Sequence, residues 1–303
     1  MLRVEFLISS LLVACVANAQ EHISDYDDSV RVEYQHARTS QYSTGTETVD
    51  FGESDTHVLL LSGVWSVNER WKLWGSLPYV QKRQEAGTYG VHDPVLDFVE
   101  YTPPDLRFVD DGHYHGGFQD FTAGMRYLAL DGPFSLSPFV SYGVPTTNYP
   151  FYGSAIRGRG LRELHVGVSM DFLPYFSDWL FQADIAYAIS EKVLGVDLNY
   201  WSTYFSASYY VTPRFLPKIF IKTRNAPNAI SSSDLEPYEE RYDNENGWRH
   251  DQTLKHNFID AGIGFDYLIS NRYSIAATYY KTIDSEDLLE IDFAATFALT
   301  LSF

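Results

Sequence analysis

The sequence predicts an all-β fold: an antiparallel, up-and-down transmembrane β-barrel of about twelve strands, with short periplasmic turns and long extracellular loops. Two observations carry this prediction. Segments of about ten residues, the length that a tilted membrane strand needs, alternate apolar residues with polar or small ones. The connections between these segments are short at one end of the strands and mostly long at the other. A barrel explains both, because a sheet in hydrocarbon must close on itself to satisfy its backbone N–H and C=O groups.

Residues 1–19 are predicted to be a signal peptide, which leaves 20–303 for the barrel. Arg3 supplies a positive start, the apolar run 6–16 is too short to cross a bilayer as a helix, and Ala17-Asn18-Ala19 is a small-x-small cleavage site. One alternative stays open, since Leu12-Val13-Ala14-Cys15 also fits a lipoprotein box in which Cys15 carries the lipid. Beyond residue 20 we find no apolar run of about 18 residues, so the sequence predicts no helical span.

Six strands are expected in the first half of the barrel. The segments 30–38, 56–65 and 71–80 alternate weakly, and the second is apolar on both faces, which leaves its orientation open. The segment 117–130 is clearer, with Phe121, Ala123 and Met125 on one face and Thr122 and Gly124 on the other. The segments 134–144 and 163–172 alternate in the same way.

Six more strands are expected at 179–189, 197–211, 215–223, 258–269, 273–282 and 289–303. The last one is the clearest of all, because its odd positions are all apolar and its even positions are polar or small. The chain stops on Phe303, and this aromatic end resembles the assembly signal of bacterial outer-membrane barrels. An even strand number puts both termini on the periplasmic side.

The lengths of the connections support this assignment. The segments 66–70, 131–133, 173–178, 212–214 and 270–272 are short and are expected at the periplasmic rim, whereas the segments near 40–55, 81–116, 145–162 and 224–254 are longer. Aromatic residues near strand ends are expected to form the two interfacial girdles. They are Trp65, Trp71, Tyr127, Trp179, Tyr187, Tyr267 and Tyr273.

Composition excludes several other classes of protein. The aromatic share of 16% excludes a disordered chain, and the net charge of −18 argues against nucleic-acid binding. A single Cys excludes a disulfide scaffold. We find no catalytic or cofactor motif, and Gly158-Arg159-Gly160 lacks the Lys of a phosphate loop, so no enzyme, cofactor or metal site is predicted. The acidic loops 81–116 and 224–254 are interpreted as solvated surface rather than as a cation site.

The strand phases predict which side chains line the lumen. The inward set mixes aromatic and charged residues, with more carboxylates than bases, and we expect it to contain Trp74, Asp120, Arg126, Phe139, Glu163, Asp184, Tyr200, Tyr204, Lys222, Asp260, Asp266, Tyr280, Glu290 and Asp292. Two interpretations are open. The lumen is a polar path that slightly favours cations, or it is an interior closed by ion pairs.

Three blocks of the sequence resemble a known family. The run from Gly63 to Val80 has a strand, a short turn ending in Arg70, and a strand closing on Leu77-Pro78-Tyr79. The blocks 117–127 and 141–167 match further strands and turns. These features are similar to the outer-membrane family named for the MetA pathway of phenol degradation, over roughly residues 55–210. The family usually has Lys where Gly143 stands and Gly where Thr147 stands, and the long acidic loops also depart from its pattern.

The resemblance implies an integral protein of the bacterial outer membrane, a channel or transporter for small hydrophobic or aromatic compounds. The inward aromatic residues agree with such solutes, because binding sites are mostly apolar with a few placed polar groups. The alternative function is a closed structural or surface-interaction barrel that acts through its acidic extracellular loops. The expected partners are outer-membrane lipid, lipopolysaccharide and a small-molecule solute of unknown identity, with no nucleic acid.

Overall fold

The computed structural model describes residues 28–44, 47–84, 109–149, 153, 155–234 and 249–303. The predicted signal peptide, with Cys15 and its possible lipid, lies outside the described residues. Most of the acidic loops 81–116 and 224–254, namely residues 85–108 and 235–248, lies outside them as well, so the interpretation of these loops as solvated surface stays a prediction.

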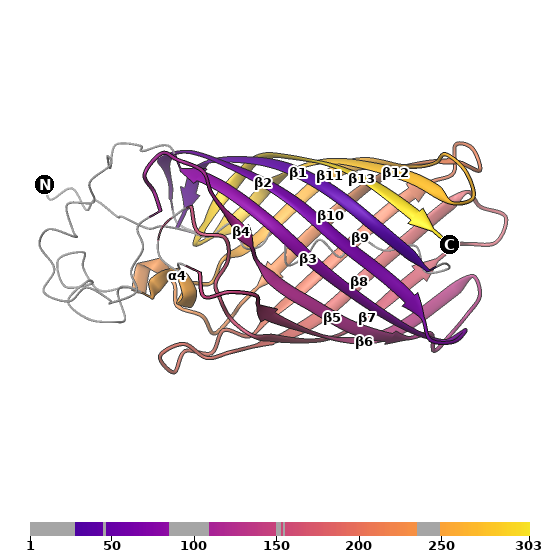
Figure 1. Ribbon diagram of the computed structural model, residues 1–303, viewed down its shortest axis with the longest axis horizontal. Helices are drawn as coiled ribbons and strands as arrows, with labels where there is room; N and C mark the ends of the chain where they lie inside the picture. The colour runs from indigo at the N-terminus through magenta and orange to yellow at the C-terminus, as the bar shows by residue number, and fades with distance from the viewer. Residues whose placement is uncertain (1–27, 45–46, 85–108, 150–152, 154, 235–248) are drawn as a thin grey trace, which may run out of the picture.

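Thirteen strands form a single antiparallel sheet that closes into a barrel (Figure 1). Apart from the short β4, which pairs with β3 alone, every described strand pairs on both sides, and β1 pairs with β13, so the sheet closes on itself. The strands are β1 (Ser29–Ser43), β2 (Thr48–Ser66), β3 (Trp71–Gln84), β4 (His115–Phe118), β5 (Asp120–Tyr127), β6 (Phe134–Pro145), β7 (Glu163–Phe172), β8 (Trp179–Ser190), β9 (Tyr200–Tyr209), β10 (Phe215–Asn225), β11 (Asn257–Leu268), β12 (Tyr273–Glu286) and β13 (Leu288–Ser302).

Strands β4 and β5 occupy a single position in the wall. Both pair with β3, and the three residues 119–121 stand opposite only two, Leu77 and Pro78. Pro78 has no N–H to give to the ladder, so a bulge at this point is the expected result. Its carbonyl still accepts a hydrogen bond from the Gln119 N–H at 3.0 Å. The barrel therefore has twelve strand positions, and the predicted number is confirmed.

Five short connections, 67–70, 128–133, 173–178, 210–214 and 269–272, lie at one end of the barrel, the right-hand end of Figure 1. Polar side chains close these turns: the Asn68 carboxamide oxygen accepts the N–H groups of Arg70 and Trp71, both at 2.9 Å. The two ends of the barrel chain meet there too, since the Phe303 N–H donates to the Asp28 carbonyl at 3.0 Å. This end is the periplasmic one.

The longer connections lie at the opposite, extracellular end. They include the 3₁₀ turn η1 (Ser232–Asp234) and the short helix α4 (His250–Thr253). Two further short connections at this end join β1 to β2 and β12 to β13. Within the described residues, no helix is long and apolar enough to cross a membrane.

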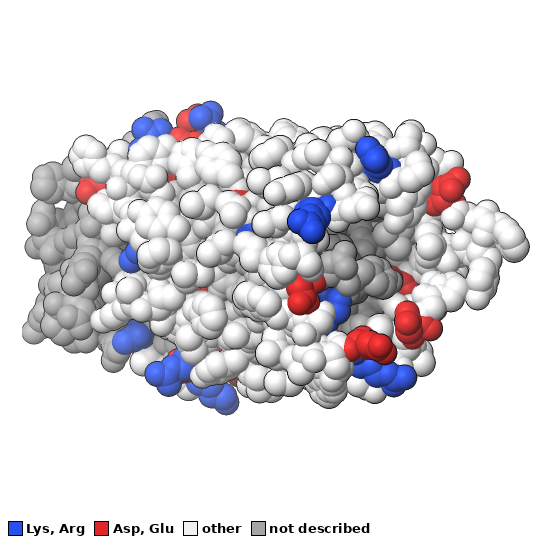
Figure 2. All heavy atoms as spheres, turned by 45° about the vertical axis from the view of Figure 1, so that its right-hand side comes forward, with Lys and Arg blue, Asp and Glu red and all other residues white. Residues whose placement is uncertain are grey.

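The outer wall carries the apolar side of the alternation. Large apolar side chains such as Leu59, Ile263 and Phe297 are more than half exposed, as lipid-facing residues of a barrel must be. In Figure 2 the charged side chains gather toward the two ends of the molecule and leave a mostly uncharged zone between them. Aromatic rings flank this zone, with Trp71 and Tyr127 packed 4.9 Å apart at the periplasmic end. The structure therefore places the apolar belt of a membrane barrel on the outside.

The wall is taller on one side than the sequence predicts. Strands β1, β2, β3 and β12 continue past the expected ends 38, 56, 80 and 282 toward the extracellular rim, and β2 reaches 19 residues. Charged side chains occupy outward positions of this added part on β2 and β3: Asp55 lies 2.8 Å from Arg83 and 3.5 Å from Arg38. Such a network does not belong in hydrocarbon, so this part of the wall stands above the membrane.

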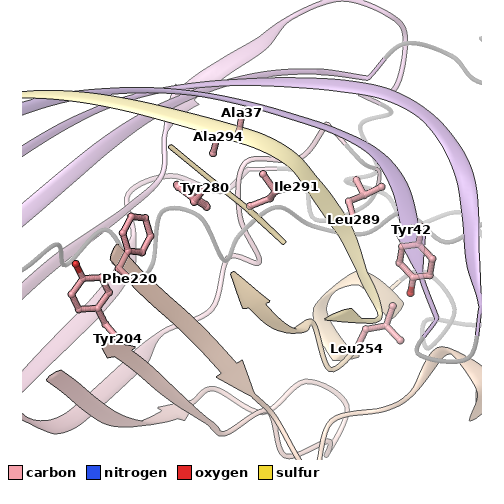
Figure 3. Close-up of a cluster of buried hydrophobic side chains, with 9 residues drawn as sticks. All are labelled: Ala37, Tyr42, Tyr204, Phe220, Leu254, Tyr280, Leu289, Ile291 and Ala294. Atoms are coloured by element: carbon pink, nitrogen blue, oxygen red, sulfur yellow. The ribbon is translucent and has the colours of Figure 1, made fainter. Parts of the chain in front are cut away.

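The expected phase of β13 is wrong at its beginning. Ile291 pairs with Thr39 and Phe293 with Arg38, so Asp292 is an extra residue in a bulge. From Ala294 onward the predicted alternation holds. Before the bulge it is reversed: Leu289 and Ile291, which were expected to face lipid, are buried in the interior cluster of Figure 3, and Asp292 is exposed.

Candidate functional site

The interior of the barrel is the candidate site, and its residues fall into groups. One group lies on β9, β10 and β12, where Tyr204, Phe220 and Tyr280 pack together (Figure 3). The Lys222 ammonium lies 4.5 Å from the Tyr280 ring centroid, and the Gln35 amide donates to the Tyr280 hydroxyl at 2.7 Å. This mixture of cation and rings combines an apolar surface with fixed polar contacts.

Asp260 is beside this group on β11. Its carboxylate accepts a hydrogen bond from the Thr282 hydroxyl at 2.8 Å and stands in register with Lys222 on the neighbouring strand. The wall leaves room for the rings at Gly262, where a Cβ atom would lie 2.5 Å from Tyr280 and from Phe220. The absence of a side chain there lets the aromatic residues lie against the sheet.

A second group is the arginine–tyrosine cluster, which consists of Arg159, Glu163, Tyr200 and Arg224. It lies at the extracellular ends of β7, β9 and β10. Glu163 accepts hydrogen bonds from Arg159 and from the Tyr200 hydroxyl, both at 2.8 Å, and the Arg224 guanidinium carbon lies 3.9 Å from the Tyr200 ring centroid. Apolar side chains surround Tyr200, which leaves the charges of the cluster in a dry setting.

The other predicted residues are spread over the remaining wall. Trp74 is buried against Gly124, the Phe139 ring lies against Gly167, and Asp184 accepts a hydrogen bond from Ser169. Asp266 lies 3.3 Å from Lys218. These residues do not meet in one place.

Arg126 belongs to a vestibule at the periplasmic mouth. It stands in register with Lys72, and both line a cavity of about 340 Å³ together with Ser135, Ser137 and residues of the 66–70 turn. The cavity is lined by the bases Arg70, Lys72 and Arg126 together with the carboxylates Glu69 and Asp131. It gives the periplasmic end of the interior a concave lining with charges of both signs.

Glu290 and Asp292 were predicted for the lumen, and the bulge in β13 changes that assignment. Glu290 is partly exposed and accepts a hydrogen bond from Ser285 at 3.1 Å, and Asp292 is exposed and accepts one from Ser40 at 3.1 Å. Leu289 and Ile291 take the interior positions instead. The two acidic side chains therefore do not take the inward positions that unbroken alternation predicts.

The β6–β7 connection lies across the extracellular end of the barrel. On one side, the Ala155 N–H donates to Asp110 at 2.7 Å. On the other, Gln252 of α4 donates to the Arg159 carbonyl at 2.6 Å. These anchors belong to opposite parts of the wall, next to β4 and β11. The connection thus narrows the mouth and carries Arg159 into the interior.

Tyr149 fixes the fold of this connection. Its hydroxyl donates to Asp120 at 2.6 Å and accepts the Gly160 N–H at 3.0 Å. Burial, with the Asp120 carboxylate alongside, raises the pKa of Tyr149, so it remains a hydrogen-bond donor at neutral pH. Arg157 lies with its guanidinium 5.2 Å from the Tyr149 ring centroid, and burial lowers the pKa of Arg157.

The sequence did not identify Lys82, Arg159 and Arg224 as interior residues. Lys82 and Arg224 follow the predicted ends of their strands, and both continue the inward phase in the structure. Extending the alternation by one or two residues finds both. Arg159 belongs to an irregular connection, and no local pattern marks it.

The described residues include no group of three or more His, Cys, Asp and Glu side chains placed to hold a metal ion. His115 instead lies 2.8 Å from Asp111 at the rim.

Comparison with known proteins identifies the kind of fold. No protein-family model and no curated protein sequence matches the chain. Among solved structures, an outer-membrane channel from Pseudomonas putida F1 is similar, with 13% identity, a TM-score of 0.66, and coverage of 94% of this chain and 100% of that one. The chain is an outer-membrane β-barrel.

The barrel is also similar to the translocator domain of the autotransporter NalP from Neisseria meningitidis, with 11% identity, a TM-score of 0.51, and coverage of 96% of this chain and 93% of that one. At such identities the likeness concerns the fold. With its closed wall and apolar belt, the barrel is an integral protein of the bacterial outer membrane. The resemblance to the family named for phenol degradation stays a prediction.

Proposed function

We propose that this barrel is a channel through which small solutes cross the outer membrane passively. The observation that carries the proposal is the polar interior. Charged side chains occur from Lys72 and Arg126 at the periplasmic vestibule to Arg224 at the extracellular end. A barrel that serves only as a membrane anchor gains nothing from buried charges, because their desolvation is costly.

Inward aromatic residues support solutes with an apolar or aromatic body. Trp74, Phe139, Tyr204 and Tyr280 are on the interior face of the wall, next to polar groups that can orient a solute. The outer belt contacts outer-membrane lipid, and lipopolysaccharide is the proposed neighbour in the outer leaflet. The proposal assigns no chemical reaction to the protein, no cofactor and no nucleic-acid partner.

Conductance tests the proposal. The full-length protein, purified and inserted in planar bilayers, is expected to conduct, and liposomes that contain it should swell in neutral aromatic alcohols. Heat-modifiable migration on gels serves as the control for a folded barrel. A folded barrel with neither conductance nor solute entry contradicts the proposal and supports the alternative, a closed structural or surface-interaction barrel.

A further inference from the structure

Arg224 of the arginine–tyrosine cluster is a buried charge without an ion-pair partner among the described residues. Its side chain is on the inward face of β10, with 3% of the residue exposed. The Nε and Nη2 atoms have no hydrogen-bond partner in the described part of the chain. Its recorded contact is with the face of the Tyr200 ring, which satisfies neither N–H group.

Glu163 attracts Arg224 electrostatically, but its oxygens already accept hydrogen bonds from other groups. One of its oxygens accepts from Arg159 at 2.8 Å and from Ser190 at 3.2 Å. The other accepts from Tyr200 at 2.8 Å and lies 3.4 Å from His165. The carboxylate therefore has two neighbours on each oxygen.

Arg159 has spare donors as well. It is 2% exposed, and while one terminal nitrogen binds Glu163, its Nε and Nη1 atoms have no partner. Two buried guanidinium groups thus share one carboxylate and leave N–H groups unsatisfied. Leaving donors of a buried charged group unsatisfied is expensive, so an arrangement of this kind points to a partner other than the described side chains.

The free edge of Arg224 indicates what that partner is. The Nε–H and Nη2–H bonds of a guanidinium are parallel and form the fork that binds both oxygens of a carboxylate. The interior aromatic group is farther along the same strand, where Phe220 is on the same face as Arg224. A solute held at the fork by its carboxylate would have an apolar surface within the same lumen.

We propose that Arg159 and Arg224 form an anion site at the extracellular end of the lumen, and that the solutes of the channel include small aromatic carboxylates. The inference rests on the proposed channel function and names its solute class. It also reverses the slight preference for cations that the sequence predicts. Along the inward face of β10, Lys222 comes next after Arg224 and Lys218 follows beyond Phe220, so basic side chains recur on this strand.

Benzoate is the probe. Wild-type channels in planar bilayers should be more permeable to chloride than to potassium, and benzoate should reduce the chloride current in a saturable way. Arg224→Gln should weaken the apparent benzoate affinity about tenfold or more, because a charge-assisted bidentate contact is lost. Arg224→Lys keeps the charge but loses the two parallel N–H groups, so its benzoate affinity should lie between those of wild type and Arg224→Gln. The matched control is Arg162→Gln, which removes the same charge from an exposed position nearby.

The outcomes separate the two proposals. A channel that conducts but is insensitive to benzoate, or one whose benzoate block survives Arg224→Gln, overturns the anion site and leaves the channel function intact. Block by inorganic phosphate without block by benzoate overturns the carboxylate assignment. If no conductance is found, the site can still be tested by binding. Calorimetry then measures the affinity of the detergent-solubilised barrel and of the same variants for benzoate. Absence of both conductance and binding overturns both proposals.

Discussion

Glycine residues on the interior face decide where the aromatic side chains can lie. At Gly124 a Cβ atom would be 2.6 Å from the Trp74 ring and 2.7 Å from the Ser141 Cβ atom. At Gly143, also on the inward face, the nearest atom to a Cβ is the Thr122 hydroxyl at 3.5 Å, an ordinary contact. The two sites offer a matched test of this packing.

Gly124→Ala should destabilise the barrel by about 1–3 kcal/mol, because Trp74 must leave its position. Gly143→Ala should change stability by less than about 0.5 kcal/mol. Urea titration of tryptophan fluorescence in detergent gives both values. Equal stability of the two variants would contradict the role assigned to Gly124.

Asp287, in the tight connection between β12 and β13, gives stability a pH dependence. It is fully buried and accepts the Ser232 N–H at 3.0 Å, and burial raises its pKa. The folded state therefore holds the proton more tightly than the unfolded state. Its favourable contribution is complete below the unfolded pKa, near 4, and is lost as the pH rises through the folded pKa.

Asp287→Asn imitates the protonated form and should be more stable than wild type at pH 8. The difference should shrink as the pH falls toward 4, when the wild-type carboxyl becomes protonated. Urea midpoints measured across this range provide the comparison, with the exposed Asp284→Asn as the control. A difference that stays constant with pH would show that ionisation of Asp287 is not involved.

At the scale of elements, the strands could be predicted well and the connections poorly. β7 has the predicted bounds, 163–172, because its two faces meet different solvents. β10 ends at Asn225 rather than at the expected 223, and this small difference leaves Arg224 out of the predicted lumen. The bulge at Asp292 cannot be seen in the sequence, because the apolar residues alternate without interruption across it. The sequence pattern therefore predicts the wrong face for the residues before the bulge. Arg159 becomes an interior residue through contacts with α4 and Glu163 that are remote from any local pattern.

The β6–β7 connection is expected to limit conductance. Tyr149→Phe removes the hydroxyl that joins Asp120 to the Gly160 N–H, which should loosen the connection and raise single-channel conductance. Tyr175→Phe, at an exposed position of a periplasmic turn, is the control and should leave conductance unchanged. Single-channel recordings distinguish the variants. Wild-type conductance in Tyr149→Phe would show that the connection does not restrict the path.

At the scale of the whole molecule, closure depends on the pairing of the first strand with the last. Val30 stands directly opposite Leu301 in this seam. Cysteines in place of both residues should form a disulfide across the seam, because directly opposed residues have Cβ atoms about 4.5–5.5 Å apart. The cross-linked chain should migrate faster on non-reducing gels after boiling. A pair at Val30 and Leu299, two residues out of register, should cross-link far less, and equal yields would contradict the observed register.

The unequal height of the wall gives the entrance a direction. β2 has 19 residues and β9 has 10, which correspond to about 60 Å and about 33 Å of strand. The extracellular rim is therefore higher on the β1–β3 side of the barrel than on the β8–β10 side. The high side of the wall therefore shields the interior from molecules that approach from that direction. Tyr200 and Arg224 lie on the low side, beneath the connections that follow β8 and β10, so a molecule that reaches them has already passed these connections.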